Sequence, residues 1–345
     1  MIEYLPWSHK TLNECTSAHS NKKIPTLDLE FSSVCTGANC VYCDSKPFVG
    51  SKMKNELTKD SMMILLKKCK EKGLKWIYTC GLGEPTEDAK FWDALSFAKE
   101  SNIVISLFSN GLFITKEKAK RLKDSGACII LKMDTFDKKN FDLILGGTGR
   151  AEKVYQSLDY LLDAGYGSNT QYTDLAFSIV PTSLSLSGIP DVIQFALENG
   201  IFPSVGELEK AGNANKNNTY DSLHVGVDQL QEIKKLLDKH FDGNYKRPIC
   251  PAIITGLHFN NMGNCIIDKE TGLNCIWFML KEPKISIIGN YKDDLDELYD
   301  TIDKIRRNFF SHYLDGSSYK DVFGGCGGNR QEIFQKARTC MFEGK

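Results

Sequence analysis

The sequence predicts an α/β protein whose centre is an open barrel of parallel strands. Between about residues 26 and 212, apolar strand-like runs alternate with amphipathic helical runs, which is the pattern of consecutive βα units. About six such units can be counted, too few to close an eight-stranded barrel. Because ligands of parallel sheets bind at the carboxyl ends of the strands, the loops that follow the strands are expected to hold the functional residues.

The βα units follow one another in order along the chain. The strands are expected at residues 26–31, 74–79, 103–108, 128–133, 175–180 and 203–206. The helices are expected at residues 58–72, 88–101, 116–125, 150–164 and 190–199. In the first helix Thr58 is a suitable N-cap, and Met62 and Leu65 recur at helical spacing. The Gly- and Asn-rich stretch at 210–218 is interpreted as the exit from this domain.

The composition indicates a single globular chain. It has 345 residues, of which 41% are hydrophobic and 25% charged, and a formal net charge of −1. No apolar run approaches the length of a membrane helix, and the balanced charge argues against binding to a nucleic-acid backbone. Twelve cysteines in a chain of this size favour metal ligation in a reducing compartment over a disulfide scaffold, so a cytoplasmic location is expected.

Three cysteines lie within nine residues, just after the first expected strand. Cys35, Cys40 and Cys43 share a loop with Gly37 and Asn39, two residues that tolerate a positive φ. Three thiolates at this spacing can bind three irons of a 4Fe–4S cluster and leave the fourth iron open. A zinc site would need a fourth nearby Cys or His, which the local sequence lacks. Buried, unligated thiols are a further alternative, but such a loop is a poor match to core packing.

Two further loops complete a pattern. The sequence Gly-Leu-Gly-Glu-Pro at 81–85 follows the second strand, and Ser-Asn-Gly at 109–111 follows the third. Together with the cysteine loop and Tyr42, which precedes the third cysteine, these loops resemble those of the radical S-adenosylmethionine enzymes over roughly residues 24–212. The commonest spacing in that family is three residues and then two between the cysteines, whereas this chain has four and then two.

The resemblance implies a partial (β/α)6 barrel that binds a cluster together with S-adenosylmethionine. In that family the open iron binds the amino and carboxylate groups of S-adenosylmethionine, whose reductive cleavage gives methionine and a 5'-deoxyadenosyl radical that abstracts hydrogen from the substrate. A flavodoxin or ferredoxin would supply the electron. The implied iron ligands are Cys35, Cys40 and Cys43. The implied S-adenosylmethionine contacts are Gly81, Gly83 and Glu84 at the amino group, Tyr42 near the adenine, and Ser109 and Asn110 near the ribose or carboxylate.

A second group of cysteines lies after residue 249: Cys250, Cys265, Cys275, Cys326 and Cys340. The region resembles the auxiliary-cluster extensions named SPASM or twitch, whose paired short strands would match residues 258–260 and 265–268. Five cysteines allow one four-cysteine site, and we expect a second 4Fe–4S cluster on Cys250, Cys265, Cys275 and Cys326. Cys340 is an alternative to Cys275, and zinc is an alternative to the cluster.

The chain is thereby divided into three parts. Residues 1–23 are an N-terminal extension, 24–212 the barrel, and 213–345 the auxiliary-cluster region. In the last part, residues 294–310 are expected to form a charged amphipathic helix.

Cys80 and Glu209 are the candidate catalytic residues. Cys80 ends the second strand, where a thiol could donate a hydrogen atom to a substrate radical and complete an epimerisation. Glu207 and Glu209 follow the sixth strand, and Lys132 and Asp134 lie at the end of the fourth, so one of these groups could accept a proton during a dehydrogenation. The six histidines are scattered and form no pattern.

The expected activity is hydrogen abstraction from a sugar, an aminoglycoside-like small molecule or a peptide, leading to oxidation or epimerisation. Peptide maturases of the family often carry a leader-binding domain ahead of the barrel, and residues 1–25 are too short to form one. This favours a small molecule, or a peptide recognised by other means. The alternative from a different class is a non-catalytic iron–sulfur or zinc protein that binds a partner through its C-terminal half.

Overall fold

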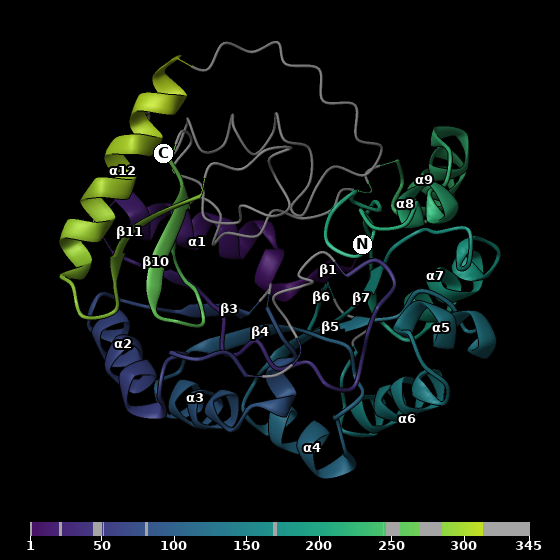
Figure 1. Cartoon of the computed structure of the whole chain (residues 1–345), viewed down its shortest axis with the longest axis horizontal. Helices are drawn as coiled ribbons and strands as arrows, with labels where there is room; N and C mark the ends of the chain where they lie inside the picture. The colour runs from purple at the N-terminus through teal and green to yellow at the C-terminus, as the bar shows by residue number, and fades with distance from the viewer. Residues whose placement is uncertain are drawn as a thin grey trace.

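The computed structural model describes residues 2–20, 23–43, 50, 52–79, 82–167, 171–243, 245, 256–269 and 285–312. Within these ranges, the main sheet has nine strands in the order β11-β10-β9-β2-β3-β4-β5-β7-β8. The strands from β9 to β8 in this order are parallel neighbours, and β10 pairs antiparallel with both β9 and β11. Most of the helices form an arc outside these strands (Figure 1). The predicted α/β class with a partial barrel is confirmed.

All six predicted βα strands are present. They are β2 (Thr26–Leu29), β3 (Trp76–Thr79), β4 (Val104–Ser109), β5 (Cys128–Lys132), β7 (Leu175–Ile179) and β8 (Phe202–Val205). The five predicted helices are present as α2 (Lys59–Glu71), α3 (Ala89–Glu100), α4 (Lys116–Asp124), α6 (Arg150–Asp163) and α7 (Ile189–Glu198). The side chains of Thr58, Asp88 and Thr115 cap the first three of these helices by accepting a hydrogen bond from a backbone amide of the first turn.

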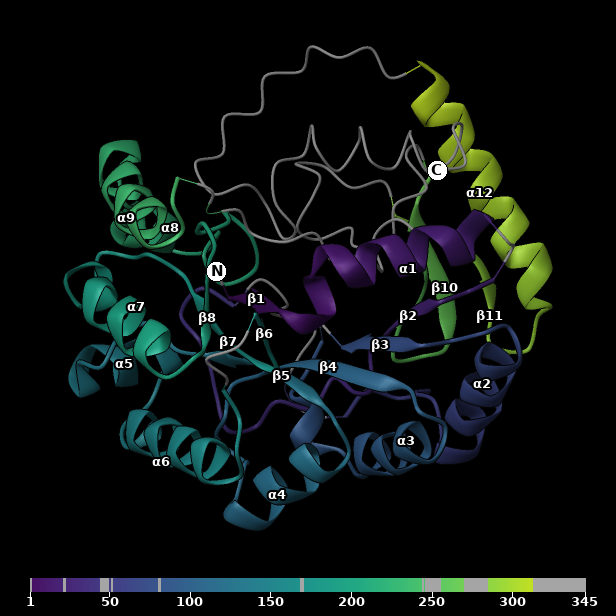
Figure 2. The same cartoon turned by 180° about the vertical axis from the view of Figure 1, so that it is seen from behind.

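The first residues of the chain pack inside the barrel, which the sequence did not predict. This segment contains β1 (Glu3–Tyr4), the 3-10 helix η1 (Leu5–Trp7) and α1 (His9–Ser20), and β1 pairs with β6 (Tyr172–Thr173). The hydroxyl of Tyr4 bonds to the hydroxyl of Ser106 at 2.9 Å. The hydroxyl of Tyr78 donates to the carbonyl oxygen of Pro6 at 2.9 Å. Since Tyr4 and Trp7 are buried, the segment covers the inner face of β3 and β4, and α1 lies in front of the strands in the view from behind (Figure 2).

The C-terminal strands continue the same sheet. They are β9 (Gly256–Phe259), β10 (Asn264–Asp268) and β11 (Ile285–Asn290), and α12 (Leu295–His312) follows them. Both the short strand pair and the charged helix predicted for this region are therefore present. The sheet does not end at the expected domain boundary at residue 212, because β9 pairs in parallel with the edge of β2 that the first six strands leave open.

Besides α1, three α-helices of the described residues were not predicted: α5 (Lys138–Leu145), α8 (Thr219–Leu223) and α9 (Val227–His240). Asp137 caps α5, and Gly146 ends it with φ of 73°. A Cβ atom at Gly146 would lie 2.2 Å from the carbonyl oxygen of Asn39, so the end of α5 lies directly against the cysteine loop. Of the helices in the described ranges, none is both long and apolar enough to cross a membrane.

Replacing Trp7 with alanine should destabilise the protein by about 3–5 kcal/mol, because the buried indole fills space inside the barrel. Its ring centroid lies 5.1 Å from that of Tyr4 and 6.1 Å from that of Phe108. The measurement is urea unfolding of both proteins. Lys10→Ala, on the exposed side of α1, is the control and should change stability by less than about 0.5 kcal/mol. Equal effects of the two substitutions would contradict the placement of Trp7.

Candidate functional site

The loop that carries the three clustered cysteines begins just after β2 and is held on both sides. On one side, the amide of Cys35 donates to the carbonyl oxygen of Gly50 at 3.0 Å. On the other side, the amides of Asn39 and Val41 donate to carbonyl oxygens in the last turn of α5, each at 3.0 Å. These contacts give the loop a defined path at the carboxyl end of β2, the strand that the sequence predicted it to follow.

The chemistry of the loop fits a cationic cluster. Cys35, Cys40 and Cys43 are partly exposed, and none of them forms a disulfide. Burial, together with the nearby Glu84 carboxylate and the Cys40 thiol, raises the pKa of Cys35 to about 12. Burial also raises the pKa of Cys40, although Lys132 opposes this effect. Thiols in such surroundings ionise at neutral pH when a metal compensates their charge, and iron would supply that positive charge.

Glu84 connects the predicted binding loops. Its carboxylate, which is 2% exposed, accepts hydrogen bonds from the amide and hydroxyl of Thr86 at 3.1 and 2.6 Å. It also accepts from the hydroxyl of Ser109 at 2.9 Å and from the amide of Asn110 at 2.7 Å. Burial raises the pKa of Glu84, while these hydrogen bonds oppose the rise. The loops after β3 and β4 are therefore joined by one carboxylate.

The neighbouring backbone brings the cysteine loop to the same place. The amide of Glu84 donates to the carbonyl oxygen of Val34 at 2.7 Å, and the side-chain nitrogen of Asn110 lies 3.8 Å from the sulfur of Cys35. Gly83 has φ of +77°, and a Cβ atom there would lie 2.2 Å from the carbonyl oxygen of Ser32. Only glycine fits this contact. Cys80 and Gly81, which precede it, lie outside the described residues.

Tyr42 is held by two charged residues at the end of β5. Its hydroxyl donates to Oδ2 of Asp134 at 2.6 Å and accepts a hydrogen bond from Nζ of Lys132. Lys132 also binds Asp134 at 2.6 Å and lies 4.3 Å from the centroid of the Tyr42 ring. Asp134 in turn accepts from the amide of Val180 at 2.8 Å. Lys132 and Asp134, which the sequence offered as acid–base candidates, thus fasten the cysteine loop to β5 and β7.

The stretch after β8, interpreted from the sequence as a domain exit, reaches the cysteine loop. The backbone amide of Asn213 donates to the carbonyl oxygen of Cys43 at 2.8 Å. The side-chain nitrogen of Asn213 donates to the carbonyl oxygen of Cys40 at 2.9 Å. Sequence analysis missed this contact, for which the only local signal was the Gly/Asn-rich composition. The predicted proton acceptor Glu209 lies in the same stretch with an exposed side chain close to Tyr220.

Of the four predicted ligands of the auxiliary cluster, the structure describes Cys265. This residue lies on β10, is 0% exposed and belongs to the main hydrophobic core. Burial raises its pKa to about 12. Cys250, Cys275 and Cys326 lie outside the described residues, as does the reserve ligand Cys340.

A buried ionisable group of three residues was missed by sequence analysis. His258 on β9 places Nε2 3.3 Å from Oε1 of Glu30 and Nδ1 4.0 Å from Oδ2 of Asp28. All three residues are less than 5% exposed. Burial raises the pKa of Asp28 to about 6, with a further rise from Glu30 and an opposing effect of His258. Sequence analysis found no sign of this group, because Asp28 lies on β2 and Glu30 just after it, far along the chain from His258.

Gly83→Ala should destabilise the protein by more than Gly126→Ala does. Both glycines have a positive φ, so each substitution incurs the strain of about 1–2 kcal/mol that an L-residue meets there. Only at Gly83 would the new Cβ also collide with backbone, since Gly126 has nothing within 4 Å of that position. Urea unfolding of the two variants gives the comparison. Equal losses would show that the contact with Ser32 is absent.

Asp28→Asn should make stability less dependent on pH. The pKa of Asp28 is about 6 in the folded protein and 3.8 in the unfolded chain. The folded protein therefore loses stability as the pH rises from 3.8 through 6, because the buried carboxyl group must ionise. Relative to the wild type, the variant should gain up to about 3 kcal/mol between pH 4 and pH 8. Urea unfolding across this range measures the difference. A difference that stays constant with pH would contradict the raised pKa.

Comparison with known proteins agrees with this geometry. The profile of the Radical SAM superfamily matches residues 29–176. The mycofactocin maturase MftC of Mycolicibacterium smegmatis is 23% identical over 253 residues, which are 70% of this chain and 61% of MftC. A tungsten-containing aldehyde ferredoxin oxidoreductase cofactor-modifying protein of Pyrococcus furiosus is 26% identical over 132 residues, 37% of this chain and 36% of that protein. The chain thus spans less than two thirds of the length of these relatives.

Solved structures share the fold. SuiB of Streptococcus suis bound to S-adenosylmethionine has a TM-score of 0.62 and 18% identity, covering 91% of this chain and 75% of SuiB. The structure of native anSMEcpe with bound AdoMet and Cp18Cys peptide has a TM-score of 0.58 and 16% identity, covering 92% of this chain and 96% of that one. Over residues 29–176, the chain is therefore similar to the radical S-adenosylmethionine superfamily.

Proposed function

We propose that this protein cleaves S-adenosylmethionine reductively and uses the resulting 5'-deoxyadenosyl radical to abstract hydrogen from a peptide substrate. The observation that carries the proposal is the meeting of three loops at the carboxyl ends of β2, β3 and β4. There the Cys35 sulfur lies beside Asn110, and Glu84 binds the backbone on both sides. A 4Fe–4S cluster on Cys35, Cys40 and Cys43 would supply the electron and bind the methionine end of S-adenosylmethionine.

The residues of the chain have separate roles in this proposal. Gly83 leaves room for the backbone of the cysteine loop, Gly81 would allow close approach of the ligand to the backbone, and Tyr42 would face the adenine. Ser109 and Asn110, assigned from the sequence to the ribose or carboxylate, also orient the Glu84 carboxylate through the hydrogen bonds described above. A carboxylate held by fixed donors is already positioned to accept from an ammonium group.

Similarity to maturases favours a peptide over a sugar or aminoglycoside-like substrate. MftC is named a maturase, and SuiB has been solved with its precursor peptide SuiA bound. The reaction we favour is oxidation, in which the substrate radical loses an electron to a second 4Fe–4S cluster. The ligands proposed for it are Cys250, Cys265, Cys275 and Cys326. Glu209 would accept the proton that leaves with that electron.

Epimerisation is the competing outcome, with Cys80 as the hydrogen donor to the substrate radical. A reaction in deuterated water separates the two outcomes, since the thiol exchanges with solvent and would deliver deuterium to carbon, whereas oxidation adds none. In the cell a flavodoxin or ferredoxin in the cytoplasm would supply the electron. A non-catalytic iron–sulfur or zinc protein remains the alternative of a different class.

Anaerobic reconstitution with iron and sulfide tests the proposal. With dithionite and S-adenosylmethionine, the protein should form 5'-deoxyadenosine and contain about eight irons per chain, or about four if it holds a single cluster. The variant Cys35→Ala/Cys40→Ala/Cys43→Ala should lose about four irons and all 5'-deoxyadenosine formation. Cys128→Ala, which removes a buried thiol of the core on β5, is the matched control and should keep both. Bound zinc with no 5'-deoxyadenosine would support the non-catalytic alternative.

A further inference from the structure

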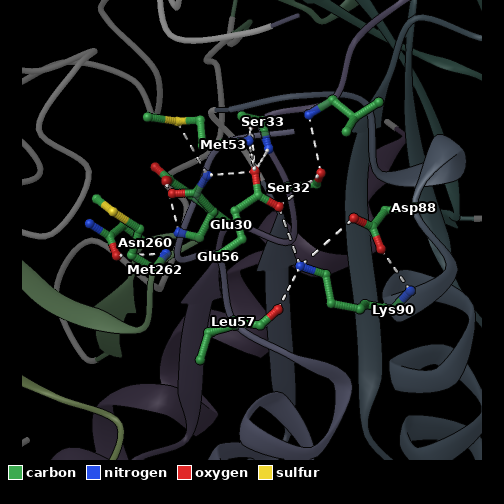
Figure 3. Close-up of polar contacts among 12 residues, drawn as sticks. Glu30, Ser32, Ser33, Met53, Glu56, Leu57, Asp88, Lys90, Asn260 and Met262 are labelled. Atoms are coloured by element: carbon green, nitrogen blue, oxygen red, sulfur yellow. Dashed lines mark hydrogen bonds and ion pairs between the residues drawn. The ribbon is translucent and has the colours of Figure 1, made fainter. Parts of the chain in front are cut away.

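The carboxylate of Glu56 is a buried meeting point for three separate segments. It lies in the stretch between the cysteine loop and α2, and its side chain is fully buried. Figure 3 shows its polar contacts. It accepts hydrogen bonds from the amide of Ser33 at 3.0 Å, from the hydroxyl of Ser33, and from the amide of Met53 at 3.1 Å. From the turn between β9 and β10, the side-chain nitrogen of Asn261 donates to the same carboxylate at 3.3 Å.

These donors connect the cysteine loop with the C-terminal hairpin. Ser33 lies two residues before Cys35 and bonds through its carbonyl oxygen to the amide of Gly50 at 2.8 Å. At the other end of the stretch, the amide of Leu57 donates to the carbonyl oxygen of Asn261 at 2.7 Å. A Cβ atom at Gly263 would lie 2.6 Å from the Leu57 side chain, so the hairpin turn packs directly against this stretch.

Lys90 of α3 compensates the buried charge. Its ammonium group lies 3.5 Å from the Glu56 carboxylate and 3.8 Å from that of Asp88, and it donates to the carbonyl oxygen of Leu57 at 2.9 Å. Burial opposes ionisation of Glu56, but the hydrogen bonds from Ser33 and Met53, together with Lys90, hold its pKa below the usual value. A carboxylate held in this way has a fixed position, because moving it would leave several buried donors without an acceptor.

We propose that Glu56 is a positioning residue that couples the cysteine loop to the β9–β10 hairpin, so that the conformation of one depends on the other. The hairpin opens the region in which an auxiliary cluster is proposed, and the cysteine loop is where the cluster that cleaves S-adenosylmethionine would bind. A change in the C-terminal region is thereby transmitted to the cysteine loop. The inference rests on the proposed function only in the identity of the group that the loop binds.

Hydrogen exchange of the full-length apo protein tests the coupling without any cluster. In Asn261→Ala, amides of the hairpin at 256–264 should exchange faster, and so should those of residues 31–43, by about tenfold or more. The effect needs no direct contact between Asn261 and the three cysteines, since it passes through Glu56. Glu56→Gln keeps the shape and one acceptor oxygen but loses the charge, so both segments should loosen less than in Glu56→Leu.

The double variant Glu56→Leu/Asn261→Ala should exchange no faster in residues 31–43 than Glu56→Leu alone, because the connection is already broken. Lys59→Met is the matched control, since it removes an exposed ion pair of 2.7 Å to Asp93 between the neighbouring helices α2 and α3. It should leave both segments unchanged. Strands β5 and β7 should keep their protection in every variant that folds.

If Asn261→Ala loosens the hairpin but leaves residues 31–43 at the wild-type rate, the coupling is refuted. Asn261→Ala and Glu56→Gln also keep the test decisive if Glu56→Leu fails to fold. In reconstituted protein the electron paramagnetic resonance spectrum of the reduced cluster should change in Asn261→Ala and stay unchanged in Lys59→Met. Because the exchange experiment uses apo protein, it can succeed even where the proposed enzymatic function fails.

Discussion

Strand β2 forms hydrogen bonds along both of its edges, and the arrangement of the candidate site depends on this pairing. It runs parallel to β3 on one side and to β9 on the other. Parallel strands that are paired in register end at the same edge of the sheet. The cysteine loop after β2 therefore meets the Gly83–Glu84 loop after β3 and the turn after β9. Loss of the pairing with β3 would move the loop that carries Glu84, whose amide bonds to Val34 next to Cys35.

Buried negative charge is concentrated at this edge of the barrel. Counted as whole residues, Glu30, Glu56 and Glu84 are 3%, 8% and 2% exposed. Each lies within reach of donors from another segment, such as His258 for Glu30 and Asn110 for Glu84. Burying a carboxylate costs free energy unless fixed donors bind it. A loop conformation that removed these donors would therefore be less stable.

Local sequence patterns were sufficient where the signal lies within one segment. The helix α2 could be placed because Thr58 caps it and its apolar residues recur at helical spacing. The helix α5 was missed because eight residues are too few for a clear periodicity, although Asp137 marks its start. The burial of Tyr4 and Trp7 was missed for a different reason. Their neighbours Ser106 and Phe108 lie on β4, about a hundred positions away in the sequence.

The sequence by itself determined the order of the βα units, the spacing of the three cysteines and the glycine at position 83, because these depend on residue types and local periodicity. Only the tertiary structure decided that His258 lies against Glu30, that Asn213 binds the cysteine loop, and that Glu56 joins this loop to Asn261, 205 positions away. The physical reason is that strand pairing sets these contacts. Which open edge β9 joins depends on backbone hydrogen bonds and packing across the whole sheet, and no local pattern of side chains records that choice.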